Sequence, residues 1–225
     1  MADERAGVKL ERFWTIYARS YDQIWDSAVS AATRAVVHDG LGEVATVVDL
    51  GCGTGLLSAG LGVRGIEVIG VDSSVAMLTR ALECGRITRV VHAAADAVPL
   101  EPRVAGAVII GNLLHLHPDP AAVVCEARRL LKPGGVIVAT WPVPGLTPGA
   151  MWRADRRAGR PLIGTLRAHL LRLRVGILAA RTRGTVAARA GGAHDTGSLL
   201  SALGLDSSHH IVTVAECQQV VIVRP

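Results

Sequence analysis

The chain has 225 residues, of which 50% are hydrophobic and 19% are charged, and its formal net charge is +5. This composition is typical of a globular protein of one domain and excludes a disordered chain. Its four cysteines show neither metal-ligand spacing nor a disulfide framework, and no apolar run reaches the length of about eighteen residues that suggests a transmembrane helix. Residues 1–5 lack the apolar region of a signal peptide, so we expect a cytoplasmic protein.

Residues 8–38 are predicted to form helices, because apolar side chains recur there at helical spacing. Tyr17 and Tyr21 are two of these positions, and they are the only tyrosines of the chain. One interpretation is that both rings anchor this helical segment on the core.

Residues 47–50 predict a buried strand, and the chain then turns through Gly51, Gly53 and Gly55. Glycine is needed where φ is positive or where a ligand lies against bare backbone. A turn at the carboxyl end of a strand that opens a helix also presents free amide N–H groups. We therefore expect a ligand-binding turn, followed by a helix that begins over residues 56–61. The alternative is a close-packed strand–helix turn without a ligand.

The stretch Asp49-Leu50-Gly51-Cys52-Gly53-Thr54-Gly55 resembles the first motif of the class I S-adenosylmethionine-dependent methyltransferases. It differs from the dinucleotide fingerprint, because Leu56 stands where the third glycine belongs. The resemblance implies S-adenosylmethionine as cofactor, and Asp49 suits its ammonium group better than it would suit a pyrophosphate. It also implies that residues 1–38 form a lid whose tyrosines, Tyr17 and Tyr21, reach the methionine end of the cofactor.

A second strand is predicted over residues 66–71, and it ends at Asp72, twenty-one positions after Gly51. An acid about this far from the glycine turn binds the ribose hydroxyls in nucleotide-binding α/β folds. Asp72 could instead cap the helix predicted over residues 75–83, since aspartate and serine are both good N-caps. The two roles are compatible if Ser73 or Ser74 caps the helix.

A third strand is predicted over residues 89–93. In the resembling family, an acid soon after this strand receives the adenine amino group. Alignment on Val98-Pro99-Leu100 places Ala94 at that position, which departs from the family pattern. Asp96 is the candidate to reach adenine from two residues further along. The alternative is adenine held by backbone amides and apolar walls alone.

Residues 104–111 are nearly all apolar and predict a central parallel strand that is buried on both faces. Ligands lie outside the carboxyl ends of such strands, so Asn112 and Leu113 should lie near the sulfonium. His115 is the candidate general base in the following loop, because imidazole titrates in the useful pH range. It could instead fill the loop or hydrogen-bond to the backbone.

The remaining elements complete an α/β fold. The resemblance implies a Rossmann-like, doubly wound and mostly parallel seven-stranded sheet with an antiparallel C-terminal strand, built from residues 10–142 and 195–225 of a single domain. The predicted elements after the central strand are a helix over 120–131 closed by glycines at 134–135, a strand over 136–140, a helix over 196–203, and a hairpin of residues 211–215 and 219–223.

Residues 143–194 are an insertion that the family pattern does not fix. Prolines and glycines over 142–149 predict a linker, and leucines then recur at helical spacing over 162–177. Residues 151–190 hold ten arginines and one acid, Asp155, and four of these arginines repeat every seven residues over 160–181.

Three interpretations of this insertion stay open. Its helix is a lid whose leucines pack on the domain and whose arginines are solvated; or it lies on an anionic membrane surface through residues 160–181; or its arginines recognise a phosphate or carboxylate of the substrate. We expect no nucleic acid partner, because Trp152 is the only aromatic side chain of the segment that could stack on bases.

The sequence therefore predicts a methyltransferase that moves a methyl group by in-line displacement to a small-molecule acceptor, amphiphilic or anionic. One alternative is a cofactor-binding regulatory protein of the same fold without methyl transfer, which the departure at Ala94 supports; another is a lipid-directed methyltransferase that docks through the basic helix. We expect no metal. The candidate cofactor-binding residues are Tyr17, Tyr21, Asp49, Gly51, Cys52, Gly53, Thr54, Gly55, Asp72, Ser73, Met77, Ala95, Asp96, Asn112 and Leu113.

Overall fold

The computed structural model describes residues 17–18, 20–144, 146–182, 194–205 and 211–225. Residues 1–16 of the expected lid and residues 183–193 of the expected insertion lie outside the described part. The chain forms one seven-stranded sheet. Its strands are β1 (Thr46–Leu50), β2 (Glu67–Asp72), β3 (Arg89–His92), β4 (Ala105–Gly111), β5 (Leu131–Pro142), β6 (Val212–Val214) and β7 (Gln218–Val223).

The strand order across the sheet is β3-β2-β1-β4-β5-β7-β6. The strands from β3 to β5 pair in parallel, and β7 runs antiparallel to both of its neighbours, β5 and β6. This confirms the predicted doubly wound sheet with its antiparallel C-terminal strand. The parallel strands also end at one common edge, which is the edge where ligands bind in open α/β sheets.

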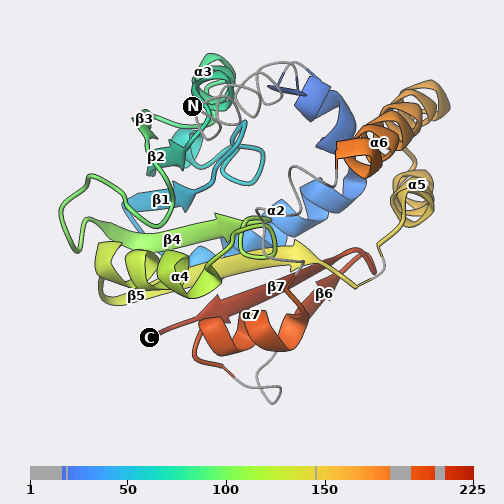
Figure 1. Cartoon of the computed structure of the whole chain (residues 1–225). Coiled ribbons are helices and arrows are strands. Elements are labelled where there is room, and N and C mark those ends of the chain that lie inside the picture. Colours follow the sequence, from blue (N-terminus) through green and yellow to red (C-terminus); the bar gives the residue numbers. More distant parts are fainter. Residues whose placement is uncertain (1–16, 19, 145, 183–193, 206–210) are drawn as a thin grey trace, which may run out of the picture.

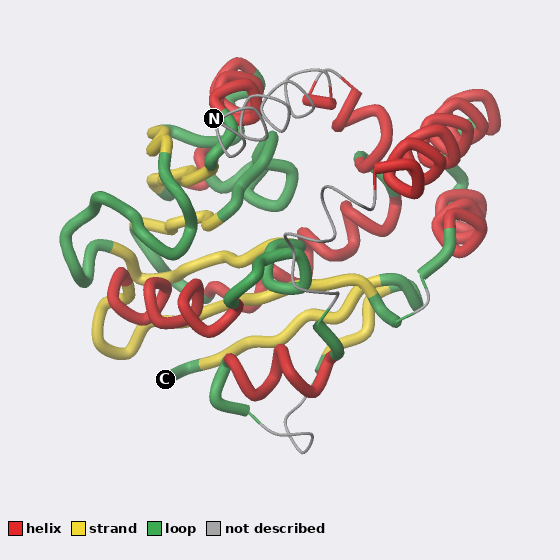
Figure 2. Tube along the Cα trace, in the orientation of Figure 1, coloured by secondary structure: helices red, strands yellow, loops and turns green. Residues whose placement is uncertain are grey.

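Helices cover both faces of the sheet (Figures 1 and 2). Within β4, Val108 and Ile110 join a core cluster with α4 and α7, whereas Ala107 and Ile109 join a cluster with α2 and α3. Alternate positions of a strand point to opposite faces, so one apolar run serves both layers. The helices are α2 (Ala28–Leu41), α3 (Val75–Glu83), α4 (Pro120–Leu130), α5 (Pro148–Arg157), α6 (Leu162–Thr182) and α7 (Thr196–Ala202), preceded by helical residues at 17–18 and 20–25.

The α-helix expected to begin over residues 56–61 is absent, and this prediction was wrong. Residues 56–60 form turns that lead into a short 3-10 helix, η1 (Gly62–Arg64). Gly60 and Gly65 adopt φ of +95° and +79°, a left-handed backbone that interrupts an α-helix. Leu61 is nevertheless fully buried, so the segment packs on the core through its apolar side chains and without regular helical structure.

Two further boundaries differ from the sequence predictions. β5 begins at Leu131, directly after α4, so Gly134 and Gly135 lie inside the irregular start of the strand and do not close the helix. A Cβ on Gly135 would lie 2.7 Å from the carbonyl oxygen of Gly106, which explains the glycine there. The linker ends before Pro148, because Thr147 caps α5 by accepting a hydrogen bond from the Ala150 N–H.

Candidate functional site

The turn after β1 has left-handed backbone at its three glycines and leaves no room for a side chain at Gly51 and Gly55. Gly51, Gly53 and Gly55 adopt φ of +67°, +54° and +73°. A Cβ on Gly51 would lie 2.9 Å from Leu113, and one on Gly55 would lie 3.0 Å from the Cβ of Arg86. The turn therefore requires glycine for both its conformation and its packing, and it brings Leu113, at the end of β4, against the end of β1.

Asp72, at the end of β2, is bonded to the same turn. Its Oδ2 accepts a hydrogen bond from the Gly53 N–H at 2.8 Å, and its Oδ1 accepts one from the Ser74 N–H at 2.9 Å. The helix α3 is capped by Ser74, whose hydroxyl accepts from the Met77 N–H, so the cap role belongs to the serine. Each carboxylate oxygen keeps a second acceptor site for a ligand. Burial raises the pKa of Asp72 above its usual value.

A second carboxyl group, Asp49, lies within β1 just before the turn. It is 2% exposed, and the Ser58 hydroxyl donates to its Oδ2 at 2.6 Å. Burial raises the pKa of Asp49 to about 7, and the neighbouring charge of Asp72 raises it further in the same direction. At neutral pH this carboxyl group is therefore only partly ionised, and a cationic group beside it would favour the carboxylate.

The helical residues 20–25 bring an aromatic cluster onto the turn. The phenol end of Tyr21 lies 4.0 Å from the position that a Cβ on Gly53 would take. Tyr17 meets Tyr21 edge to face at 5.3 Å between ring centroids, and the Trp25 indole N–H donates to the Tyr17 hydroxyl. Burial raises the pKa of both tyrosines, so both phenols are neutral at physiological pH.

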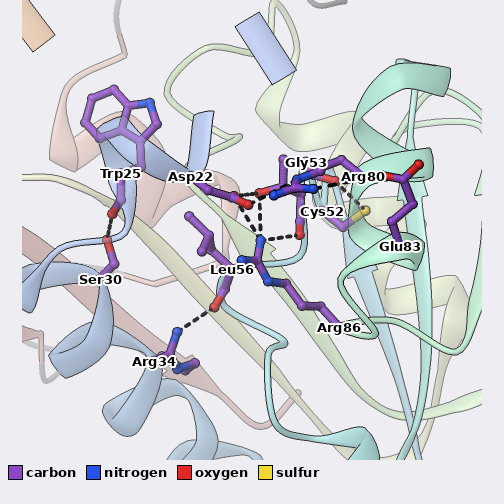
Figure 3. A network of polar contacts seen from close by, with 11 residues as sticks. Asp22, Trp25, Ser30, Arg34, Cys52, Gly53, Leu56, Arg80, Glu83 and Arg86 are labelled. Atoms are coloured by element: carbon purple, nitrogen blue, oxygen red, sulfur yellow. Dashed lines mark hydrogen bonds and ion pairs between the residues drawn. The ribbon is translucent and has the colours of Figure 1, made fainter. Parts of the chain in front are cut away.

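A polar network that the sequence did not predict joins this helix to the turn (Figure 3). Asp22 Oδ1 accepts from the Thr54 hydroxyl at 2.7 Å and from Arg86 Nη1 at 2.9 Å, and Arg86 also donates to the Thr54 carbonyl. Arg80 Nε lies 3.4 Å from the other oxygen of Asp22. Burial would raise the pKa of Asp22, but these donors hold it below its usual value. The Thr54 side chain therefore binds the helix that carries Tyr21 and Asp22.

The loop after β4 holds polar atoms that have no partner among the described residues. Asn112 has a left-handed φ of +53°, its N–H donates to the Thr140 carbonyl, and its side-chain Oδ1 is buried without a hydrogen bond. His115 Nδ1 is buried in the same way. Burial lowers the pKa of His115 to about 4, so its imidazole is neutral at physiological pH.

Two more buried polar atoms without partners in the described part, Thr140 Oγ1 and Gln218 Oε1, lie at the ends of neighbouring strands. Thr140 stands opposite Val220, and Gln218 stands opposite Pro142. The two residues are therefore diagonal neighbours on one face of the sheet. Sequence reasoning missed both, although a threonine that ends the apolar run 136–139 was a usable signal.

Asp96, the candidate to reach adenine, and the remaining cofactor-binding candidates follow β2 and β3. Asp96 is exposed, and its Oδ2 lies 3.7 Å from His117 Nε2. Ala95 is half-buried, the side chain of Met77 is buried under α3, and the carbonyl of Ser73 contacts His92 Nε2. Asp96 is thus paired with a histidine of the loop after β4, a partner that the sequence did not suggest.

The part of the chain that the structure describes holds no group of three His, Cys, Asp or Glu side chains that could bind a metal ion. None of its helices combines the length and the apolar character needed to cross a membrane.

Comparison with known families identifies the fold around this edge. Residues 48–139, which carry the glycine turn, Asp72 and the end of β4, match the family model described as a methyltransferase domain. This part of the chain is similar to the class I S-adenosylmethionine-dependent methyltransferases, as the resemblance of its glycine motif implied. S-adenosylmethionine is the cofactor of this class, as the sequence resemblance implied.

Relatives with curated names align with the same part of the domain. The ubiquinone biosynthesis O-methyltransferase of Alkalilimnicola ehrlichii is 38% identical over 98 residues, which are 41% of this chain and 39% of that protein. The demethylmenaquinone methyltransferase of Clavibacter sepedonicus is 35% identical over 141 residues, 60% of this chain and 55% of that protein. The chain therefore spans less than two thirds of the length of either relative.

Solved methyltransferase structures share the architecture. The 1,6-didemethyltoxoflavin-N1-methyltransferase of Burkholderia thailandensis, with 1,6-didemethyltoxoflavin and S-adenosylhomocysteine bound, gives a TM-score of 0.50 and 26% identity, covering 64% of this chain and 65% of that chain. A match to an S-adenosylmethionine-dependent methyltransferase of Thermotoga maritima covers 86% of this chain and 76% of that protein, with a TM-score of 0.55. Because the two sequences are only 20% identical, this match supports the fold alone.

The donors and acceptors of the methyltransferase domain suit a cofactor with a ribose and an ammonium group. Asp72 offers acceptor sites beside the turn, Asp49 offers a buried carboxyl group whose ionisation a cation would favour, and Asn112 Oδ1 is a buried acceptor without a partner in the described part. Carboxylates so close to the turn would repel a pyrophosphate. The residues present therefore fit S-adenosylmethionine better than a dinucleotide.

Proposed function

We propose that this protein transfers the methyl group of S-adenosylmethionine to a small-molecule acceptor. The observation that carries the proposal is the meeting of Asp49, the glycine turn and Asp72 at one sheet edge, with a Gly53–Asp72 hydrogen bond of 2.8 Å. When bound, the cofactor supplies a methyl group activated by the positive charge on sulfur. The chain has to hold that group in line with the acceptor, and orientation of this kind supplies about 7–11 kcal/mol at most.

Each site residue has a role in this proposal. Asp72 accepts hydrogen bonds from the ribose hydroxyls, Asp49 compensates the ammonium group, and Tyr21 covers the methionine end with Tyr17 behind it. Asn112 and Leu113 line the space beside sulfur. The backbone of residues 51–55 supports the cofactor, while Asp96 and Ala95 lie towards adenine, with Ser73 just before α3 and Met77 in its first turn.

His115 is proposed as a proton acceptor for the case in which the acceptor is a hydroxyl group. Its neutral imidazole can accept a proton at physiological pH, but a pKa of about 4 makes it a weak base. A small-molecule acceptor agrees with the names of the relatives, which refer to ubiquinone biosynthesis and to demethylmenaquinone. We propose that Thr140 and Gln218, whose buried side-chain oxygens have no partner among the described residues, lie on the acceptor side.

The domain organisation belongs to the same proposal. The proposed lids on one methyltransferase domain are the part of residues 1–38 that precedes α2 and the insertion 143–194, because residues 28–38 belong to α2, which packs on the sheet. The cytoplasm is the proposed compartment. The contact of Asp22 with Thr54 and Arg86 supports this role for the N-terminal part, because it holds a helix against the cofactor turn.

Calorimetry and methyl transfer test the proposal in two steps. We expect S-adenosylhomocysteine to bind the purified chain and NADH not to bind it, and we expect labelled methyl groups to pass from S-adenosylmethionine to small molecules of a cell extract. Binding without any transfer would favour the regulatory alternative. Absence of S-adenosylhomocysteine binding would refute both functions.

A further inference from the structure

Five large apolar side chains in the described part of α6 point outward. This contradicts the interpretation in which its leucines pack on the domain. The exposed fractions are 57% for Leu162, 84% for Ile163, 47% for Leu166, 51% for Leu170 and 42% for Leu173. We refer to these five residues as the apolar ridge. Positions three or four apart share one face of a helix, so the ridge is continuous along about three turns.

The inward side of α6 carries two buried polar residues beside Ala168, and a buried ion pair fixes it. Thr165 and Arg172 are 4% and 5% exposed. Arg172 Nη1 lies 3.2 Å from Asp155 Oδ2 on α5, and its Nε donates to the Ile24 carbonyl at 2.9 Å. Asp155 Oδ1 in turn accepts from the Ala28 N–H at the start of α2. These bonds set the rotation of α6, and the apolar ridge faces outward as a consequence.

The surface around the apolar ridge is cationic. Asp155 is the only acid in residues 148–182, and it is buried against Arg172. Five arginines of α5 and of α6 up to residue 174, where its described side chains end, are exposed, and Figure 1 shows these two helices next to each other beyond the sheet. They are Arg153, Arg156, Arg157, Arg167 and Arg174. Arg167 and Arg174 follow Leu166 and Leu173 and lie along one border of the ridge.

We propose that α6 docks this protein on an anionic lipid bilayer. An aliphatic ridge bordered by arginines suits the boundary between acyl chains and headgroups, where the apolar side enters the membrane and the cations meet lipid phosphates. A nucleic acid would satisfy the arginines but would leave the aliphatic ridge in water, since no base stacks on leucine. The inference does not depend on methyl transfer.

Co-sedimentation of the full chain with lipid vesicles tests this inference. We expect binding to vesicles of equal parts phosphatidylcholine and phosphatidylglycerol, and much weaker binding to phosphatidylcholine alone. The variant L166S/L170S/L173S should lower binding to the anionic vesicles roughly tenfold, because its ridge no longer enters the bilayer. The variant R167Q/R174Q should also lower it roughly tenfold and reduce the preference for phosphatidylglycerol.

Matched controls distinguish vesicle binding through the apolar ridge from non-specific adsorption and from misfolding. Val63 is 93% exposed on η1 and lies outside the ridge, so V63S should leave vesicle binding unchanged. All variants should keep the S-adenosylhomocysteine affinity and the melting temperature of the natural chain. Failure of the natural chain to bind anionic vesicles overturns the proposal, as does equal binding by the ridge variant.

Two competing occupants give different results. If the ridge joins two copies of this chain, L166S/L170S/L173S converts a dimer to a monomer in light scattering while vesicle binding stays absent, which overturns the proposal. If a nucleic acid is the partner, duplex DNA competes fully with vesicles and R167Q/R174Q loses DNA binding while the ridge variant retains it, which also overturns it.

Discussion

The cofactor edge of the sheet and the α5–α6 pair are organised in opposite ways. At the cofactor edge, apolar side chains such as Val48 and Leu50 are fully buried beneath a polar turn. In α6, an arginine and a threonine are buried and the leucines face outward. The sequence pattern predicted both β1 and α6. The apolar residues of β1 are buried as expected, whereas the leucines of the apolar ridge in α6 are exposed. Periodicity predicts that a helix forms, and individual polar contacts decide which side packs.

The energetic basis of the two regions differs accordingly. Full burial of a valine or leucine in β1 stabilises the fold by about 1.5–3 kcal/mol. The leucines of the apolar ridge contribute little of this, because 42–57% of their surface stays exposed. The attachment of α6 therefore depends strongly on Arg172 and its partners Asp155 and Ile24. We expect the stability of the α5–α6 pair to depend on its buried polar side chains more than the stability of the cofactor edge does.

Replacement of Asp155 gives the largest expected effect. Asp155→Asn leaves the Arg172 charge buried without compensation, because both side chains are at most 3% exposed. We expect the free energy of unfolding to fall by about 3–5 kcal/mol, measured by urea denaturation. Arg167→Gln, on the exposed side of the same helix, should change it by less than about 0.5 kcal/mol.

A double variant sharpens this comparison. Asp155→Leu combined with Arg172→Leu removes both charges, and such replacements of buried pairs are often neutral or stabilising. We expect it to be more stable than Asp155→Asn, although Ala28 and Ile24 lose their partners. If Asp155→Asn proved as harmless as Arg167→Gln, the ion pair would not be what orients α6.

Asp72→Ala should give the second largest effect, this time on binding. A hydrogen bond to a charged group is worth about 1.5–3 kcal/mol, so S-adenosylhomocysteine affinity should fall by that amount. The exposed Asp39 of α2 is the control, and its replacement by alanine should leave the affinity unchanged. Calorimetry that found equal affinity for both variants would remove the ribose role of Asp72.

Much of this molecule was predictable, and the failures have physical causes. Buried parallel strands and the helices α3, α4 and α7 show strong local patterns, and the structure confirmed them within a few residues. The helix expected after the glycine turn failed because Gly60 and Gly65 take left-handed conformations that propensity alone does not reveal. The glycine turn and Asp72 were found because a short motif sets their spacing.

Contacts between residues far apart in the chain could not be predicted from the sequence. Asp22, Thr54 and Arg86 are separated by 32 residues at each step, and nothing in their spacing suggests that they meet. The same holds for Arg172 and the Ile24 carbonyl, which are 148 residues apart. Such pairs follow from the tertiary fold, so pattern reading predicts elements and motifs but not the polar bonds that position them.

The pH dependence of binding should reveal the buried carboxyl group of the cofactor edge. The pKa of Asp49 is raised from 3.8 to about 7, so its protonated form dominates below pH 7 and its carboxylate above. An ammonium group prefers the carboxylate, so S-adenosylhomocysteine affinity should rise as pH rises through 7, by roughly tenfold between pH 6 and pH 8. His115, with a pKa of about 4, stays neutral over this range.

Asp49→Asn provides the control for this titration. The amide cannot ionise but still accepts from the Ser58 hydroxyl, so affinity should become flat between pH 6 and pH 8. Calorimetry in buffers of different ionisation enthalpy should also detect proton release on binding at pH 7 in the natural chain and none in the variant. A pH profile that is identical in both proteins would show that another group titrates.

The smallest expected effect concerns the contact between the N-terminal helix and the glycine turn. Asp22 and Arg86 are partly buried, with 17% and 18% of their side chains exposed, so their pair is screened less than a surface pair. We expect Asp22→Asn and Arg86→Gln each to weaken S-adenosylhomocysteine binding by roughly 0.5–1 kcal/mol, and the double variant to weaken it by less than the sum. Glu83→Gln, which removes only the exposed partner of Arg80, should have no effect.

Because Tyr21 neighbours Asp22 and its phenol lies close to Gly53, the loss of affinity should appear mainly as faster dissociation of S-adenosylhomocysteine. Additive single effects would mean that the ion pair does not hold this helix on the cofactor, and the cofactor edge would then close by apolar packing alone.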